Sequence, residues 1–460
     1  MDFTATIQRQ RAFFQTGATR GLAFRCEQLR KLSAALERHE SALLAALKAD
    51  LGKSSFQAFA TELGLVQAEI RHALRHLRKW VAPSRRPTPW LLWPARGWLQ
   101  PEPLGVALII GPWNYPAQLL FTPLASAIAA GNCVVLKPSE LAPRTAEAIT
   151  ALVREHFSQE FIAIENGGPE VAEALLRERF DKIFFTGSTP VGRVVMAAAA
   201  RHLTPVTLEL GGKCPAIVCA DAPVELAARR IAWGKFMNAG QTCVAPDFVL
   251  VPRGQREAFV AKLKPAIQEF YGDQPIQSAE YGRIVNARHF ERLVSYLGDG
   301  KIVYGGEHNA KELFLAPTIL AEMAPESLVM QEEIFGPILP VLEFDKLDAA
   351  LAMLRERPTP LAAYVFSRDR ATQARVLAET RSGSACVNDV VSQMVGTGLP
   401  FGGLGASGMG AYHGRAGFEA FTHQRAIMRR ATWLDLPFRY PPPKLSVAGL
   451  KRALRLLLGP

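Results

Sequence analysis

The chain has 460 residues, more than one hydrophobic core usually holds, so two or three domains are expected. A hydrophobic fraction of 49% beside a charged fraction of 21% is ordinary for a globular protein and argues against wholesale disorder. The formal net charge of +11 comes without any helix-turn-helix, zinc-finger or RNA-binding signature. We therefore expect anionic small molecules or a membrane surface as partners, and no nucleic acid.

Cysteine usage and apolar runs indicate the compartment. The six cysteines show neither CxxC nor Cys/His ligand spacing, so the sequence predicts no metal site and no disulfide framework, and a reducing compartment fits best. The first ten residues lack the apolar core of a signal peptide, and no run approaches the ~18 apolar residues of a membrane span. A cytoplasmic protein is expected.

The first eighty residues have a helical pattern, because apolar side chains recur at three- and four-residue spacings between about 5 and 80. Between Trp80 and Pro103 the character changes, and repeated prolines break any helix. The segments Trp90–Trp93 and Trp98–Leu99 are set off by turn residues. We predict a projecting hairpin over 81–103 whose exposed apolar ribbon is an interface.

From residue 106 short apolar runs alternate with helical segments, which predicts parallel strands with crossover helices. The expected strands are 106–110, 133–136, 161–164, 182–185 and 206–208, and the expected helices are 117–130, 143–157, 169–179 and 190–202. Ligands of such sheets bind beyond the carboxyl ends of the strands. Polar or glycine-rich turns follow three of these strands, at 111–115, 137–140 and 186–192, and so predict a site.

A second α/β unit follows. Its expected strands are 216–219, 248–251, 302–304, 338–344, 362–367 and 384–388, and its expected helices are 223–238, 255–270, 287–297, 346–356 and 369–380. The glycine-dense segment from Gly396 to Gly414 is expected to be loop. The spacing from Gly187 to Gly192 is not a GxGxxG fingerprint, but it fits a helix start capped by Ser188 or Thr189, where free N–H groups would favour a pyrophosphate.

Glu209 and Cys243 carry the chemistry that the sequence favours. Each alone has a plain interpretation, a solvated carboxylate or a small core residue. Together, in glycine-bearing turns, a thiol that attacks and a carboxylate that manages protons suit covalent catalysis through a thioester. The apolar neighbours Leu208 and Leu210 would raise the pKa of Glu209 toward neutrality.

These residues lie in motifs that resemble those of the NAD(P)-dependent aldehyde dehydrogenases, over roughly 5 to 430. The motifs are Gly111-Pro-Trp-Asn-Tyr-Pro116, Lys137-Pro-Ser-Glu140, Phe185-Thr-Gly-Ser188, Leu208-Glu-Leu-Gly-Gly-Lys213, Gly240-Gln-Thr-Cys243, Glu332-Glu-Ile-Phe-Gly-Pro337 and Pro400-Phe-Gly-Gly403. Three further stretches, Arg11-Ala-Phe-Phe, Asn388-Asp-Val and Ser407–Gly414, resemble the class 3 branch, which includes enzymes similar to coniferyl and fatty aldehyde dehydrogenases.

The resemblance implies a role for each catalytic position. Cys243 would add to the aldehyde carbon, and Asn114 with the backbone N–H of Cys243 would hold the oxyanion while hydride leaves for the nicotinamide. Glu209 would activate water to hydrolyse the thioester. Glu333 would position the nicotinamide ribose and, in class 3 relatives, has also been considered as a base.

The resemblance also implies the binding positions. The cofactor would be NAD, with NADP possible, and a hydrophobic aliphatic or aromatic aldehyde would be the substrate. The implied cofactor contacts are Trp113, Lys137, Glu140, Gly187, Ser188, Glu333 and Phe335. The implied substrate contacts are Tyr115, Met237, Phe401 and His413, although a plain loop histidine is an alternative for His413.

The fold implied is α/β, with a Rossmann-like cofactor domain (1–80 and 104–209), an α/β catalytic domain (210–391) and a small β bridging element (81–103 and 392–430) that favours a homodimer. The remaining 431–460 is a basic amphipathic tail, and 444–458 could rest on an anionic membrane surface, pack on a partner subunit or be disordered. Two other functions stay open: acyl transfer to coenzyme A, and a catalytically idle binding or structural member.

Overall fold

The computed structural model describes residues 2–89, 92–435, 440–442 and 446–458. Helices form the start of the chain, as predicted: α1 (Thr4–Gln15), α2 (Leu22–Arg38), α3 (Glu40–Leu51), α4 (Ser55–Ala58) and α5 (Gly64–Trp80), with short helical turns at Ala18–Arg20 and Phe59–Leu63. In α5 the side chains of Val66, Ile70, Ala73 and Leu77 recur at helical spacing and are buried. This apolar stripe packs α5 against α6.

A six-stranded sheet has the order β17-β7-β6-β3-β4-β5, and only the edge pair β17–β7 is antiparallel. Its strands are β3 (Val106–Ile110), β4 (Cys133–Lys137), β5 (Ile162–Ile164), β6 (Lys182–Thr186), β7 (Val206–Glu209) and β17 (Gly408–Met409). The crossover helices are α6 (Gln118–Ala130), α7 (Pro143–His156), α8 (Pro169–Arg177) and α9 (Thr189–Ala200). The predicted alternation of strand and helix is confirmed within a residue or two.

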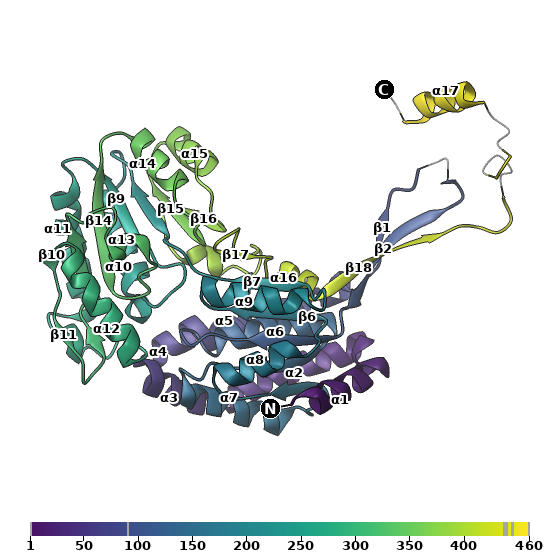
Figure 1. Ribbon diagram of the computed structural model, residues 1–460, viewed down its shortest axis with the longest axis horizontal. Coiled ribbons are helices and arrows are strands. Elements are labelled where there is room, and N and C mark those ends of the chain that lie inside the picture. The colour runs from purple at the N-terminus through teal and green to yellow at the C-terminus, as the bar shows by residue number, and fades with distance from the viewer. Residues whose placement is uncertain (1, 90–91, 436–439, 443–445, 459–460) are drawn as a thin grey trace.

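A seven-stranded sheet with the order β10-β13-β14-β9-β8-β15-β16 forms a second lobe, on the left in Figure 1. Its strands are β8 (Pro215–Val218), β9 (Phe248–Pro252), β10 (Lys301–Tyr304), β13 (Thr318–Ala321), β14 (Ile338–Phe344), β15 (Ala362–Phe366) and β16 (Ser384–Val387). The accompanying helices are α10 (Val224–Phe236), α11 (Arg256–Tyr271), α12 (Ala287–Ser295), α13 (Leu328–Gln331), α14 (Leu347–Arg355) and α15 (Arg370–Glu379).

Short elements are where the sequence prediction fell short. β13 and the small hairpin of β11 (His308–Asn309) and β12 (Phe314–Leu315) were not predicted. No predicted helix accompanies them, so the alternation of strand and helix that indicated the other short strands is missing here. The segment 396–414 is mostly loop, as expected, but it supplies β17 to the first sheet and leads into α16 (Gly414–Ala420).

The predicted hairpin is present as a three-stranded antiparallel arm. β1 (Ser84–Arg86) pairs with β2 (Arg96–Pro103), which pairs along its whole length with β18 (Thr422–Arg429). The arm projects from the body of the molecule (Figure 1). Trp93 and Trp433 meet edge to face near it, with ring centroids 5.7 Å apart, and both are more than half exposed. Trp90 of the predicted ribbon lies outside the described residues.

The chain ends in α17 (Val447–Leu458), which Figure 1 shows apart from both large sheets. Val447 and Leu450 of its predicted apolar face are exposed, as are Lys451, Arg452 and Arg455. Residues 443–445 and the side chains of Leu457 and Leu458, which also belong to that prediction, lie outside the described part. No described helix has the length and apolarity needed to cross a membrane.

Candidate active site

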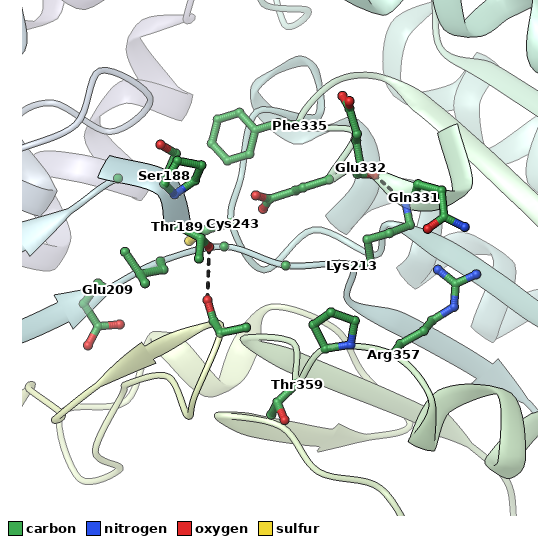
Figure 2. A pocket seen from close by; sticks show the side chains of 18 of the residues that line it. Ser188, Thr189, Glu209, Lys213, Cys243, Gln331, Glu332, Phe335, Arg357 and Thr359 are labelled. Atoms are coloured by element: carbon green, nitrogen blue, oxygen red, sulfur yellow. Dashed lines mark hydrogen bonds between the residues drawn. The ribbon is translucent and has the colours of Figure 1, made fainter. Parts of the chain in front are cut away.

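A cavity of about 1170 Å³ opens where the segments after β3, β6 and β7 meet the Cys243 loop. Its lining includes Asn114, Ser188, Glu209, Cys243 and Glu333. Figure 2 shows Ser188, Cys243 and Phe335 around this space, with Lys213, Arg357 and Thr359 toward its far side. The strand-end position that the sequence indicated is therefore hollow, and most of the predicted catalytic and cofactor residues line it.

Cys243 is held by a tight loop after α10. Asn238 and Ala239 have left-handed φ values of 54° and 51°, and a side chain on Gly240 would lie 2.2 Å from the Gly336 carbonyl oxygen. The residue is only partly exposed, and its sulfur is surrounded by protein atoms. Burial, followed by the charges of Glu333 and Glu209, raises the pKa of the thiol to about 12. A proton acceptor is therefore needed before the sulfur can attack.

Glu209 ends β7 and is 2% exposed. Neither carboxyl oxygen has a hydrogen-bond partner within the described part of the chain, and burial raises the pKa of this group well above its usual value. The predicted rise is thus confirmed, and the solvated alternative is wrong. In Figure 2 the carboxylate points away from Cys243, so a side-chain rotation or a bridging water is needed to connect the two groups.

Glu333 lies in a firmly held loop. The Arg292 guanidinium donates to the carbonyl oxygens of Glu333 (3.1 Å) and Ile334 (2.8 Å). Lys213 donates to the Glu332 carbonyl oxygen at 2.7 Å and is paired with Asp247. Burial, followed by the Asp247 charge, raises the pKa of Glu333 to about 8. This carboxyl group therefore titrates near neutral pH beside the Cys243 thiol.

Asn114 is 3% exposed, and its amide nitrogen donates to the Gln241 carbonyl oxygen at 3.0 Å. The amide has a second N–H, which is free to meet another acceptor. Behind it Lys53 donates to the Asn114 carbonyl oxygen at 2.9 Å and to Glu62 at 2.5 Å. The other Glu62 oxygen accepts from the Ala117 N–H at 2.8 Å, at the start of α6.

Lys53 and Glu62 are both 0% exposed. Burial lowers the pKa of Lys53, while the Glu62 carboxylate opposes that change. The sequence analysis missed this pair, because a lysine and a glutamate in a charged helical stretch usually face solvent. No feature of the sequence distinguishes them from their exposed neighbours.

The start of α9 fits an anionic ligand. Ser188 occupies the N-cap position, but its side chain makes no capping hydrogen bond, and Thr189 donates instead to the Ala406 carbonyl oxygen at 3.0 Å. The predicted side-chain cap is therefore wrong. Ser188, Thr189 and Pro190 line the cavity, so the positive end of the α9 dipole lies at its wall. Arg193, Arg288 and Arg357 line the same space and add positive charge.

Glycine backbone forms part of this wall. A side chain on Gly211 would lie 2.0 Å from a Glu333 oxygen, and one on Gly187 would lie 2.5 Å from the Phe185 ring. Trp113 and Phe335, whose rings are 5.3 Å apart, line the cavity as well. A large cavity lined by a helix start, cationic side chains and close backbone suits a dinucleotide.

Two groups of predicted residues are not part of this lining. Lys137 and Glu140 form a 2.6 Å ion pair after β4. Tyr115, Met237, Phe401 and His413 are all buried, the Tyr115 hydroxyl lies 2.7 Å from the Thr242 hydroxyl, and His413 stacks on Phe401 with ring centroids 5.5 Å apart. Their ligand contacts stay predictions.

His413 does not behave as a satisfied loop histidine, which was the alternative. Its Nε2 has no hydrogen-bond partner among the described residues, and burial lowers its pKa to about 4. The ring is therefore neutral at pH 7 and presents an apolar face.

The two α/β sheets place a thiol, an amide and two carboxyl groups around one large cavity with a helix start in its wall, an arrangement that fits a thiol enzyme that binds an anionic cofactor. The comparisons agree, because the model of the "Aldehyde dehydrogenase family" matches residues 1–427. The chain belongs to the aldehyde dehydrogenase family and is an aldehyde dehydrogenase, so the predicted family, enzyme class and α/β fold are confirmed.

Curated relatives and a solved structure cover nearly the whole chain. It is 45% identical over 436 residues to 4,4'-diaponeurosporen-aldehyde dehydrogenase of Staphylococcus aureus, which covers 94% of this chain and 95% of the relative. It is 45% identical over 449 residues to the dimeric NADP-preferring aldehyde dehydrogenase of Canis lupus familiaris, covering 97% and 98%. The substrate-bound Staphylococcus aureus AldH structure superposes with a TM-score of 0.97 at 43% identity, covering 99% and 100%.

Proposed function

We propose that this enzyme oxidises a hydrophobic aldehyde to the carboxylic acid with NAD(P)+, through a thiohemiacetal and a thioester on Cys243. The observation that carries the proposal is one cavity that holds the Cys243 thiol together with Asn114, two carboxyl groups of raised pKa and a helix start.

The reaction begins when the Cys243 thiol is deprotonated and its sulfur is oriented toward the aldehyde carbon. Glu333 and Glu209 are the carboxylates whose charges reach Cys243, and either could accept its proton, Glu209 only through a bridging water or after a side-chain rotation. The thiolate then bonds to the aldehyde carbon, and the carbonyl π electrons move to oxygen. Because the Gly240 loop fixes the Cys243 backbone, the sulfur does not lose freedom at that moment.

The resulting oxyanion would be held by the free N–H of the Asn114 amide and the backbone N–H of Cys243. One such donor typically contributes about 3 kcal/mol to the barrier reduction. A neutral amide stabilises the negative oxygen without protonating it, so the electron pair remains available to expel hydride from carbon. Lys53 and Glu62 act as positioning residues for this donor, because they fix the Asn114 backbone.

The nicotinamide dinucleotide, when bound, supplies the acceptor for that hydride. The start of α9 with Ser188 would hold its pyrophosphate, and Gly187 and Gly211 would allow close approach of the backbone. Trp113, Glu333 and Phe335 would position the nicotinamide end, and Lys137 with Glu140 the adenosine ribose. The carboxylate of Glu140 would disfavour a 2′-phosphate, which supports NAD, although the canine relative is named for a preference for NADP.

The last step is hydrolysis of the thioester. Glu209 would take a proton from water, and water would attack the acyl carbon and release the Cys243 thiolate. A carboxylate works well as a base when its pKa lies near the working pH. Burial raises the pKa of Glu209 from its usual acidic value and so brings it toward that range. Its two oxygens, which have no partner among the described residues, can receive that water.

The apolar character of Tyr115, Met237, Phe401 and neutral His413 supports a hydrophobic aldehyde as substrate. The Staphylococcus aureus relative is named for diaponeurosporen-aldehyde. We also propose a homodimer whose bridging element is the arm of β1, β2 and β18, with exposed Trp93 and Met428 as apolar contacts. We further propose the domain boundaries given in the sequence analysis and a cytoplasmic location. In this proposal α17 touches an anionic membrane surface.

The test is production of NADH or NADPH from a panel of aliphatic and aromatic aldehydes, in the presence and absence of coenzyme A. Turnover that needs no coenzyme A, rises with the apolar surface of the aldehyde and disappears in Cys243→Ala supports the proposal. Turnover that requires coenzyme A would replace hydrolysis by acyl transfer, and absence of any redox turnover would refute the proposed chemistry.

A further inference from the structure

A cluster of two histidines and a glutamate lies outside the catalytic cavity. His39 links the end of α2 to the start of α3, and Glu155 and His156 form the end of α7. One ligand atom from each of the three residues lies within 4.8 Å of the others. Residues from two distant parts of the chain thus present three metal-binding groups at one point.

The two imidazole nitrogens lie close to the Glu155 carboxylate but have no hydrogen-bond partner in the described part of the chain. His39 Nε2 lies 3.2 Å from Glu155 Oε2, and His156 Nε2 lies 3.7 Å from Glu155 Oε1. Both Nε2 atoms are buried, and neither has a hydrogen-bond partner among the described residues. Ligand atoms about 2.0–2.2 Å from a tetrahedral zinc ion are about 3.4 Å apart. The two His–Glu separations, which involve different oxygens of Glu155, are close to this value. The three ligand atoms lie within 4.8 Å of one another, so a modest side-chain adjustment would place them around one ion.

The side chains around the cluster can make room for an ion. Arg38 lies 3.2 Å from a Glu155 oxygen, but its side chain is 71% exposed and can move into solvent. Glu155 is itself 43% exposed, which leaves an open side for a water ligand.

We propose that His39, Glu155 and His156 form a zinc site that ties α3 to the end of α7, with water as the fourth ligand. Asp50, at the other end of α3, already accepts hydrogen bonds from the backbone N–H groups of Arg144 and Thr145 at the start of α7. The zinc ion would fasten the opposite ends of the same two helices. The two histidines are too far apart in the chain to show a ligand spacing, which is why the sequence predicted no metal site.

The test uses the full chain with Cys243→Ala, because the catalytic thiol would itself bind zinc. Zinc affinity is measured by competition with a chromophoric chelator, cobalt(II) absorption reports the ligand geometry, and Tm is recorded with and without zinc. The variants His39→Ala/His156→Ala and Glu155→Gln are compared with His202→Ala, which removes an exposed histidine elsewhere.

The expected result is one zinc ion per chain in the Cys243→Ala protein and in the His202→Ala control, with a Tm that rises on zinc addition. Binding should weaken by more than about tenfold in both cluster variants, and the rise in Tm should disappear. Glu155→Gln retains the shape of the exposed side chain and so serves if the double variant does not fold. Equal zinc affinity in the cluster variants and the His202 control would overturn the proposal.

Discussion

Removing the charge of Glu62 tests how the buried ion pair supports the oxyanion donor. Lys53 and Glu62 are fully buried and 2.5 Å apart, and Lys53 also holds the Asn114 carbonyl oxygen. Glu62→Gln keeps an oxygen that can accept from the Ala117 N–H but leaves the Lys53 ammonium without its counter-ion. Loss of one partner of a buried pair costs about 3–5 kcal/mol, a large part of a typical stability of about 5–15 kcal/mol.

The double variant Lys53→Met/Glu62→Gln separates charge from positioning. With both charges gone, most of the stability should return, because the uncompensated charge is the main cost. The Lys53 hydrogen bond to the Asn114 carbonyl oxygen is still missing, although the one from the Asn238 side chain remains. The value of kcat should therefore stay low, with a loss of at most ~10²–10³, the value of a whole oxyanion donor. Stability is measured by urea unfolding and kcat by NADH absorbance.

The matched control is Glu419→Gln, which breaks the exposed pair between Arg415 and Glu419. Its expected cost is about 0.5 kcal/mol or less. Equal unfolding free energies for Glu62→Gln and Glu419→Gln would contradict the cost assigned to the unpaired buried charge, and full kcat in the double variant would refute the positioning role.

Three further outcomes are expected. Cys243→Ala should abolish aldehyde oxidation while the unfolding midpoint stays within the range of a single conservative change, and residual oxidation at the parental rate would exclude the thiol mechanism. Glu333→Gln should lower the pKa of the Cys243 thiol, because the Glu333 charge helps to raise it. The pKa of Glu333 is about 8, so faster alkylation of Cys243 by iodoacetamide should appear above about pH 8. Unchanged or slower alkylation in that range would contradict this reasoning. Gly211→Ala should push the Glu333 carboxylate aside and lower kcat/KM for NAD+ by about tenfold or more, whereas Gly298→Ala, where no atom lies within 4 Å, should change nothing.

Much of the fold could be predicted from the sequence because short apolar runs alternate regularly with amphipathic helical segments. The strands of the first sheet, such as β3 and β4, are continuous apolar runs that are buried on both faces. β13 and β17 were missed because a few residues pair only when the surrounding sheet is already formed.

Some residues of the active site could be predicted from the sequence, and others could not. Cys243, Glu209 and Asn114 were found through motifs, and the cavity brings them together. Lys53 and Glu62 were missed because their burial depends on how α6 docks, and the capping role of Ser188 was assigned wrongly because its side chain makes no capping hydrogen bond. Sequence patterns identify reactive groups well, but they do not reveal which charged side chains a fold will bury.

The most direct test of the central claim is capture of the acyl group on Cys243. Glu209→Gln is mixed with NAD+ and a hydrophobic aldehyde, the NADH burst is recorded, and the protein is then analysed by mass spectrometry. The account predicts about one NADH per chain, slow later turnover, and an added acyl mass on the peptide that contains Cys243. Steady turnover would move the hydrolytic base to Glu333, and a burst with no acyl group on Cys243 would contradict the account itself.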